Sequence, residues 1–64
     1  MSFELYEVWA EEEDGHQELI DTTRSRSHAI QLARDSVKDG YVAAMVYQET
    51  EDGDTVEIKR FESA

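Results

Sequence analysis

The clearest strand signal lies at residues 41–48, which read YVAAMVYQ, and it leads into ETEDG at residues 49–53. Aromatic and β-branched residues favour extended backbone, and a glycine that ends an acidic run is typical of a tight turn. Residues 55–61, TVEIKRF, then return as another strand. This segment therefore predicts a β-hairpin in the C-terminal part of the chain.

The same pattern occurs once more, 38 residues earlier. Residues 8–15, VWAEEEDG, resemble residues 46–53, VYQETEDG, and Ile20 then corresponds to Ile58. The strands that flank this earlier turn are predicted at residues 3–10 and 17–22. Two copies are too few to define a repeat architecture, so we interpret the resemblance as two hairpins with the same turn and the same shape.

A helix is predicted between the two hairpins. Small and apolar side chains recur there at helical spacing, at Ala29, Ile30, Ala33 and Val37. Ser25 is the expected N-cap, because its hydroxyl can accept a hydrogen bond from a free amide of the first turn, and Ser27 is the competing choice. Gly40 follows the helix at the position where glycine commonly ends one.

The register of each hairpin decides which side chains share a face. In the first hairpin, a two-residue turn would place Val8 opposite Asp21, whereas a three-residue loop at residues 13–15 places Val8 opposite Ile20. A one-residue slip exchanges the two faces of a strand, so a buried face penalises the wrong register. We therefore predict the three-residue loop.

The second hairpin follows the same reasoning. A three-residue loop at residues 51–53 places Val46 opposite Ile58, and the matching loop in the first hairpin places Trp9 opposite Leu19.

A right-handed crossover through the helix brings the third strand beside the first, which gives the sheet order 2-1-3-4 with every neighbour antiparallel. The order 1-2-3-4, with strands 2 and 3 parallel, is the alternative.

The fold class that follows is α+β. Residues 1–64 form a single ββαββ domain, in which a single-layer four-stranded antiparallel sheet carries one helix packed on one face. The even-numbered face is small and β-branched, and it is the predicted core under the helix. Its members are Tyr6, Val8, Ile20, Val42, Ala44, Val46, Val56 and Ile58.

The odd-numbered face is rich in large apolar side chains. They are Phe3, Leu5, Trp9, Leu19, Tyr41, Met45, Tyr47 and Phe61, and they are mixed with Glu7, Glu57 and Lys59. A single helix cannot cover both faces, and a large apolar surface without a cover typically marks an interaction site. Except for Phe3, these apolar residues are the candidate protein interface.

The charge of the chain limits its partners. The formal net charge is −10, from 16 acidic and 6 basic residues, and the chain has no cysteine. A surface of this sign repels phosphate and anionic lipid, which argues against direct binding to nucleic acid or membrane.

No segment approaches the roughly 18 apolar residues of a membrane span, and the N-terminus lacks the pattern of a signal peptide. A cytoplasmic protein is therefore the default expectation.

No pattern brings catalytic residues together. His16 lies at a turn and His28 in the first helical turn, and no cysteine is present as a nucleophile. The acidic turns lack the ligand order of a calcium loop, and the three glycines lie too far apart for a phosphate-binding loop. We therefore expect no enzyme activity, no metal site and no cofactor.

The acidic residues gather at the two turns. The candidate acidic surface comprises Glu11, Glu12, Glu13, Asp14, Glu49, Glu51, Asp52 and Asp54, whereas four of the six basic residues lie at Arg24, Arg26, Arg34 and Lys38. In the order 2-1-3-4 the turns fall at opposite ends of the sheet and present two separated anionic clusters. Such clusters serve solubility in many proteins, but they also suit a groove that accepts phosphates.

Two functional hypotheses follow. The first is a non-catalytic protein-interaction module that forms a homodimer through the odd-numbered face, or binds another protein there. A domain of this size buries only about 60% of its unfolded surface, and a two-fold contact requires no other gene product. The second is an acidic nucleic-acid mimic that binds and inhibits a basic nucleic-acid-binding protein.

Overall fold

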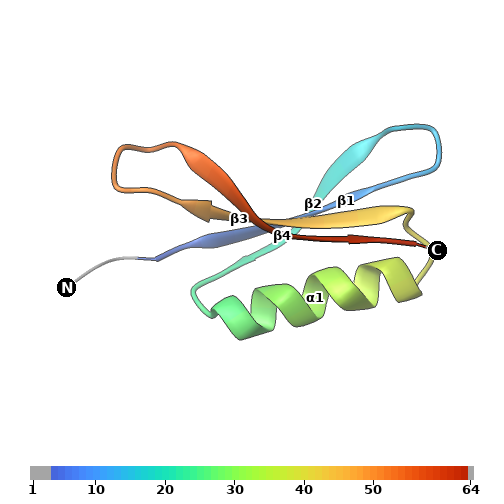
Figure 1. Ribbon diagram of the computed structural model, residues 1–64, viewed down its shortest axis with the longest axis horizontal. Helices are drawn as coiled ribbons and strands as arrows, with labels where there is room; N and C mark the ends of the chain where they lie inside the picture. Colours follow the sequence, from blue (N-terminus) through green and yellow to red (C-terminus); the bar gives the residue numbers. More distant parts are fainter. Residues whose placement is uncertain (1–3, 64) are drawn as a thin grey trace.

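The computed structural model describes residues 4–63 and has the predicted architecture (Figure 1). Its elements are β1 (Tyr6–Glu11), β2 (Gln17–Thr23), α1 (Arg26–Lys38), β3 (Ala43–Glu49) and β4 (Thr55–Glu62). The predicted start of the first strand at Phe3 lies outside the described residues.

The four strands form one antiparallel sheet in the order β2-β1-β3-β4. This confirms the predicted order and rules out the alternative with strands 2 and 3 parallel. Figure 1 shows α1 along one side of the sheet, while the turns of both hairpins rise away from the helix at opposite ends of the molecule. We call the side of the sheet opposite α1 the open face.

The boundaries of α1 follow from its caps. The Oγ atom of Ser25 accepts a hydrogen bond from the backbone N–H of His28 at 3.2 Å, so Ser25 is the N-cap. Ser27 lies inside the helix, with its Oγ 3.2 Å from that of Ser25. The helix ends at Lys38, with Asp39 as the C-cap and Gly40 following, as predicted.

The core lies between α1 and the inner strands. Val8 and Val46 are completely buried opposite each other on β1 and β3, and Ala29 and Ala33 of α1 are completely buried as well. Two alanines on the contact face let the helix approach the sheet closely, and each buried valine contributes about 1.5–3 kcal/mol. The predicted core face is confirmed at its centre, but two of its predicted members do not join the core: Val42 precedes β3 and is not in the core cluster, and Val56 is 52% exposed.

Both hairpins have the predicted three-residue loops. The backbone N–H of Glu12 donates to the carbonyl of His16, and that of Thr50 donates to the carbonyl of Asp54, both at 2.8 Å. The last loop residues, Gly15 and Gly53, have φ angles of 92° and 87°, which residues with a Cβ rarely adopt. The register next to the loops is therefore as expected, with Trp9 opposite Leu19.

Further from each loop the predicted register is wrong, because both hairpins contain a β-bulge. Val8 pairs with Asp21 instead of Ile20. Val46 pairs with Lys59 instead of Ile58. The two bulges occupy equivalent positions 38 residues apart, so the internal similarity of the sequence extends to an irregularity that the sequence pattern did not predict.

The bulge in β4 exchanges the faces of the residues that follow it. Phe61 pairs with Ala44 and packs against the helix-side core, although the alternation predicted it on the other face. Lys59, also predicted there, lies on the helix side, with Nζ 5.4 Å from the centre of the Phe61 ring. Arg60 takes the open-face position opposite Met45 instead. A bulge allows Ile58 and Phe61 to face the helix together, which a regular strand of period two forbids.

Candidate functional site on the open sheet face

The centre of the open face consists of two rows of side chains that cross all four strands. The first row holds Leu19, Trp9, Met45 and Arg60, in the order β2, β1, β3, β4. The second row holds Thr22, Glu7, Tyr47 and Glu57. Trp9 and Tyr47 are thus diagonal neighbours on the two inner strands. Diagonal cross-strand neighbours lie about 7–8 Å apart, within reach of aromatic side chains.

Glu7 fixes the orientation of Trp9. The indole Nε1–H of Trp9 donates to Oε1 of Glu7 at 2.9 Å, and both residues are half-buried. A hydrogen bond to a charged acceptor is stronger than one between neutral groups. The indole ring is therefore held in one position beside a carboxylate that keeps a second oxygen available.

A shallow pocket of about 320 Å³ lies over these residues. It is lined by Glu7, Trp9, Gln17, Tyr47 and Thr55, so all four strands contribute. Gln17 and Thr55 come from the outer strands and occupy equivalent positions in the two hairpins, as do Trp9 and Tyr47. Figure 1 shows both hairpins bending away from the helix, and the pocket lies on the side of the sheet toward which they bend.

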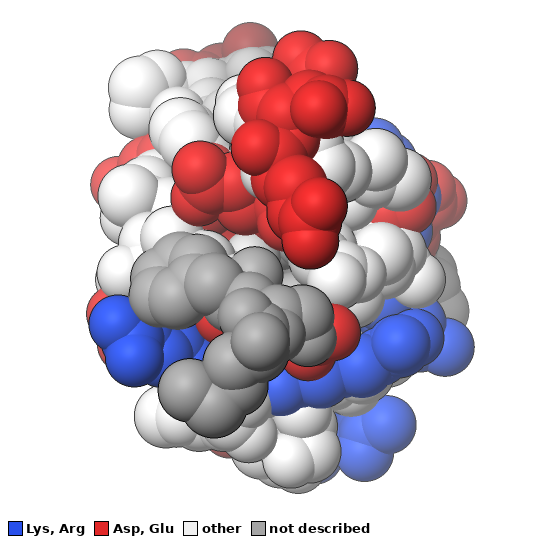
Figure 2. Space-filling view, turned by 90° about the vertical axis from the view of Figure 1, so that its left-hand side faces the viewer, with Lys and Arg blue, Asp and Glu red and all other residues white. Residues whose placement is uncertain are grey.

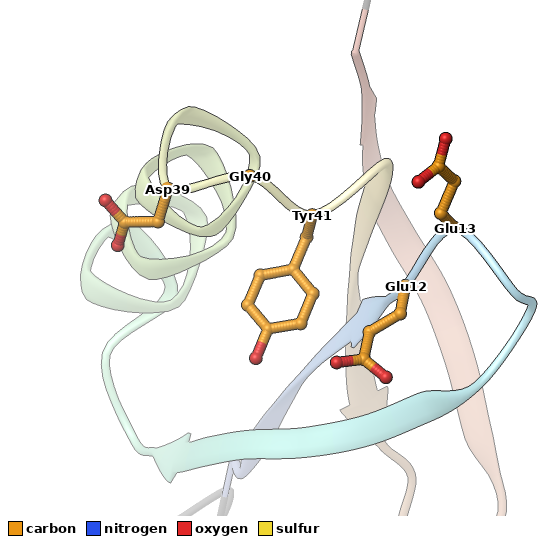
Figure 3. Close-up of a pocket in the computed structure, with 5 residues that line it drawn as sticks. All are labelled: Glu12, Glu13, Asp39, Gly40 and Tyr41. Atoms are coloured by element: carbon orange, nitrogen blue, oxygen red, sulfur yellow. The ribbon is translucent and has the colours of Figure 1, made fainter.

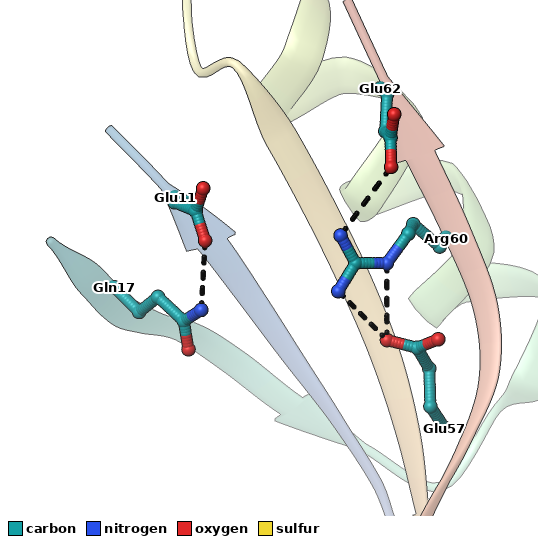
Figure 4. Close-up of polar contacts among 5 residues, drawn as sticks. All are labelled: Glu11, Gln17, Glu57, Arg60 and Glu62. Carbon is teal, nitrogen blue, oxygen red and sulfur yellow. Dashed lines mark hydrogen bonds and ion pairs between the residues drawn. The ribbon is translucent and has the colours of Figure 1, made fainter. Parts of the chain in front are cut away.

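Polar contacts occupy the two outer parts of the open face (Figure 4). The guanidinium of Arg60 lies 3.3 Å from Oε1 of Glu57 and 3.5 Å from Oε1 of Glu62. The hydrogen bond and charge of Glu57, with a smaller contribution from Glu62, raise the pKa of Arg60. Near β2, Nε2 of Gln17 donates to Oε1 of Glu11 at 2.9 Å. Arg60 is thus engaged by its own strand rather than by the pocket.

The predicted interface residues are only partly brought together. Trp9, Leu19 and Tyr47 lie on the open face, and Leu19 is 48% exposed. Leu5, half-buried before β1, bonds through its carbonyl to the N–H of Glu49. Met45 is completely buried between Trp9 and Arg60, so it supports the open face from below without offering a contact surface.

Tyr41 and Phe61 do not belong to the open face. Both pack against the core on the helix side. The ring of Phe61 also lies 5.5 Å from the guanidinium carbon of Arg34. Tyr41 precedes β3, and its hydroxyl donates to Glu18 Oε1, a bond that raises the pKa of Tyr41. The predicted place of these two residues on the open face is therefore wrong, because neither follows the uninterrupted alternation on which it depended.

Sequence reasoning missed Arg60, Gln17 and Thr55 as residues of this surface. The usable signal was the spacing of Ile58 and Phe61, because two apolar residues three positions apart in a strand indicate a bulge if both are buried. With that bulge in place, Arg60 moves to the open face. Gln17 and Thr55 carry no such signal, since their part in the pocket depends on the bending of the hairpins.

A second pocket, of about 350 Å³, lies at the end of α1 (Figure 3). It is lined by Glu12, Glu13, Asp39, Gly40 and Tyr41. Figure 3 shows carboxylates from the first turn and from the helix end on either side of the tyrosine ring. Within residues 4–63, no group of three or more His, Cys, Asp or Glu side chains is arranged to hold a metal ion.

The charges are separated in space as well as in sequence. Figure 2 views the molecule from the end at which the β3–β4 turn lies. Acidic residues gather in the upper part, and Lys and Arg gather in the lower part, at the level of α1. At this end of the molecule the helix side is therefore basic and the turn side acidic. The β1–β2 turn at the other end is acidic in sequence, with Glu12, Glu13 and Asp14.

No helix in the described part of the chain is long and apolar enough to cross a membrane. Comparisons with protein-family models, curated proteins and solved structures gave no match.

Proposed function

We propose that this protein is a non-catalytic protein-interaction module whose open sheet face is the binding surface. The observation that carries the proposal is the pocket over Trp9 and Tyr47, on the side of the sheet that α1 does not cover. Tryptophan and tyrosine are enriched at protein interfaces, because their rings bury a large area while a polar group stays paired. Leu19 extends this surface as its most exposed large apolar side chain.

The charge of the open face bears on whether its partner is a second copy of this chain or a different protein. Its strand carboxylates are Glu7, Glu11, Glu49, Glu57 and Glu62, against the single cation Arg60. A second copy placed face to face would bring two acidic surfaces together, and like charges at an interface are costly. We therefore place a basic protein first and a homodimer second among the partners.

The proposal is tested with two matched variants. Leu19 and Val56 are similarly exposed, at 48% and 52%, but only Leu19 lies on the open face. We expect immobilised protein with Leu19→Lys to lose the partners that the unchanged protein and the Val56→Lys variant both retain. If Leu19→Lys retains the same partners as Val56→Lys, the open face is not the binding surface.

A second candidate, an acidic mimic of nucleic acid, is supported by the positions of the turns. Both turns lie at the ends of the longest axis of the molecule, which measures 38 Å, and both project away from α1. They would present two anionic clusters to a basic groove. This candidate predicts competition with nucleic acid for a basic protein, binding that weakens steeply with salt, and loss of binding when Glu11, Glu12, Glu49 and Glu51 become Gln. Unchanged competition by that variant would eliminate it.

A further inference from the structure

The pocket over Trp9 and Tyr47 combines aromatic rings with a carboxylate. Trp9 and Tyr47 line it together with Glu7, and the Glu7–Trp9 hydrogen bond of 2.9 Å keeps ring and carboxylate in a fixed relation. A cation near an aromatic face is attracted by the negative charge density of the ring, and tryptophan provides the strongest such face. A carboxylate beside the ring adds a direct charge partner.

We propose that this pocket binds an arginine side chain of a partner protein. The inference rests on the proposed function and names the chemistry of the group that the open face recognises. A planar guanidinium can stack on an aromatic ring while its N–H groups reach the carboxylate of Glu7 at the ring edge, whereas the compact ammonium of lysine cannot do both in one plane. The side chains of Gln17 and Thr55 supply further hydrogen-bond acceptors.

The charge balance of the open face favours a cation from outside. Only two basic residues lie in the four strands, Lys59 and Arg60. Lys59 lies on the helix side beside Phe61, and Arg60 is engaged by Glu57 and Glu62. The pocket therefore has a carboxylate and two aromatic rings, but no strand cation of its own directed to it.

The size of the pocket also fits one side chain. Its volume of about 320 Å³ is at the lower end of the range of about 300–1,000 Å³ found for ligand pockets. The same kind of contact already occurs on the helix side, where Arg34 and Lys59 lie 5.5 Å and 5.4 Å from the centre of the Phe61 ring. The aromatic groups of this fold thus already accept cations where the chain supplies them.

Trp9 is the only tryptophan, so its fluorescence reports on the pocket directly. The probes are three short blocked peptides that differ at one residue, which is arginine, lysine or citrulline, the neutral isostere of arginine. We expect a saturable change in Trp9 emission with the arginine peptide and binding about five- to thirtyfold weaker with citrulline. The lysine peptide is expected between these limits.

The matched variants separate charge from shape. Glu7→Gln keeps an oxygen that can accept the Trp9 N–H but removes the negative charge, so arginine binding should weaken by about fivefold or more. Glu13→Gln removes an exposed carboxylate of the first turn, outside the pocket, and should leave binding within about twofold. Tyr47→Leu should also weaken binding, with folding confirmed by cooperative unfolding in urea.

Several results would overturn the inference. Equal binding of the arginine and citrulline peptides would show that charge is not recognised, and equal binding of arginine and lysine would contradict a planar site. Unchanged affinity in Glu7→Gln would contradict the role of its carboxylate. If the arginine peptide fails to bind while Leu19→Lys still abolishes partner capture, the open face is an interface and the cation pocket alone is wrong.

Discussion

Val8 lies directly opposite Val46 across β1 and β3, and the two residues occupy equivalent positions in the two hairpins. A pseudo-two-fold axis therefore passes between them and relates β1–β2 to β3–β4. The axis also exchanges Trp9 with Tyr47, so the pocket on the open face lies on it. The buried valine pair thus lies on this axis on the helix side of the sheet, and the aromatic pair lies on it on the open face.

The valine pair should be energetically coupled. Both side chains are completely buried, and truncation to Ala leaves a cavity, so Val8→Ala and Val46→Ala should each lower the free energy of unfolding by about 2 kcal/mol. Because the two side chains are in contact, the double variant should deviate from additivity by about 0.5 kcal/mol or more. Urea unfolding followed by Trp9 fluorescence measures all three changes.

The control for this cycle is Val56→Ala, at a side chain that is 52% exposed, where the change should stay within about 0.5 kcal/mol. Strict additivity of the two buried truncations would contradict the direct contact across the pseudo-two-fold axis.

Replacing either loop glycine by a residue with a Cβ should lower the stability of the protein. Gly15 and Gly53 have φ angles of 92° and 87°, and a Cβ at either position would meet nothing within 4 Å. The cost of Gly15→Ala or Gly53→Ala is therefore conformational, about 1 kcal/mol each, and the Asn variants should cost less. Thermal unfolding of the four variants tests this, and an Ala variant as stable as the unchanged protein would contradict the left-handed geometry.

The first turn of α1 should depend on one serine. Ser25→Ala removes the acceptor for the His28 N–H and should lower the free energy of unfolding by about 1 kcal/mol. Ser27→Ala removes a hydroxyl that pairs with the Ser25 side chain and caps no backbone group among residues 4–63, so its effect should stay below about 0.5 kcal/mol. Chemical unfolding of both variants distinguishes the two positions, and the reverse ranking would assign the cap to Ser27.

Tyr41 should make the protein less stable at alkaline pH. The hydrogen bond to Glu18, together with burial, raises the pKa of Tyr41 above 10.0 in the folded protein. The unfolded chain then releases this proton at a lower pH than the folded protein does. The contribution is therefore fully present below pH 10 and is lost as pH rises through the folded pKa.

The measurement for this prediction is the urea midpoint across the alkaline range, and Tyr41→Phe should flatten the decline. Tyr6, whose pKa is raised mainly by its hydrogen bond to Glu4, keeps part of the pH dependence in that variant. A decline of unchanged slope in the Tyr6→Phe, Tyr41→Phe double variant would rule out both phenols as its source.

Self-association through the open face should become stronger as the salt concentration rises. Two acidic open faces repel each other, and added salt screens that repulsion, so any homodimer should form more readily at high ionic strength. Sedimentation equilibrium at low and high salt measures this. A dimer that is tightest at low salt would instead indicate that the basic helix side of one copy meets an acidic surface of another, and Trp9→Glu would leave such a dimer intact.

Local signals in the sequence were enough to predict the order of elements, the N-cap, the loop lengths and the central faces of β1 and β3. Each of these depends on signals within a few residues, such as the spacing of Ala44 and Val46 or the position of Gly53 after an acidic run. The sheet order followed from the general handedness of crossovers, which needs no side-chain detail.

The faces of the outer strands were harder to predict, because no characteristic residue type marks the position of either bulge. Neither Ile20 nor Ile58 is a glycine, so residue type does not mark either bulge, and the spacing of Ile58 and Phe61 is the signal that the sequence offers for the second one. The error then passes to every later residue of the strand, as it did for Phe61. The burial of Met45 depends on its neighbours Trp9 and Arg60, and the second of these reaches its position only through the bulge.

The bulges also protect the two free edges of the sheet. β2 and β4 each have one edge without a partner strand, and such edges can recruit further strands into fibrils when they are flat and regular. An extra residue in each edge strand interrupts the even spacing of its amide and carbonyl groups and increases its twist. The irregularity that shapes the open face therefore also keeps this small sheet from growing by addition of strands at its margins.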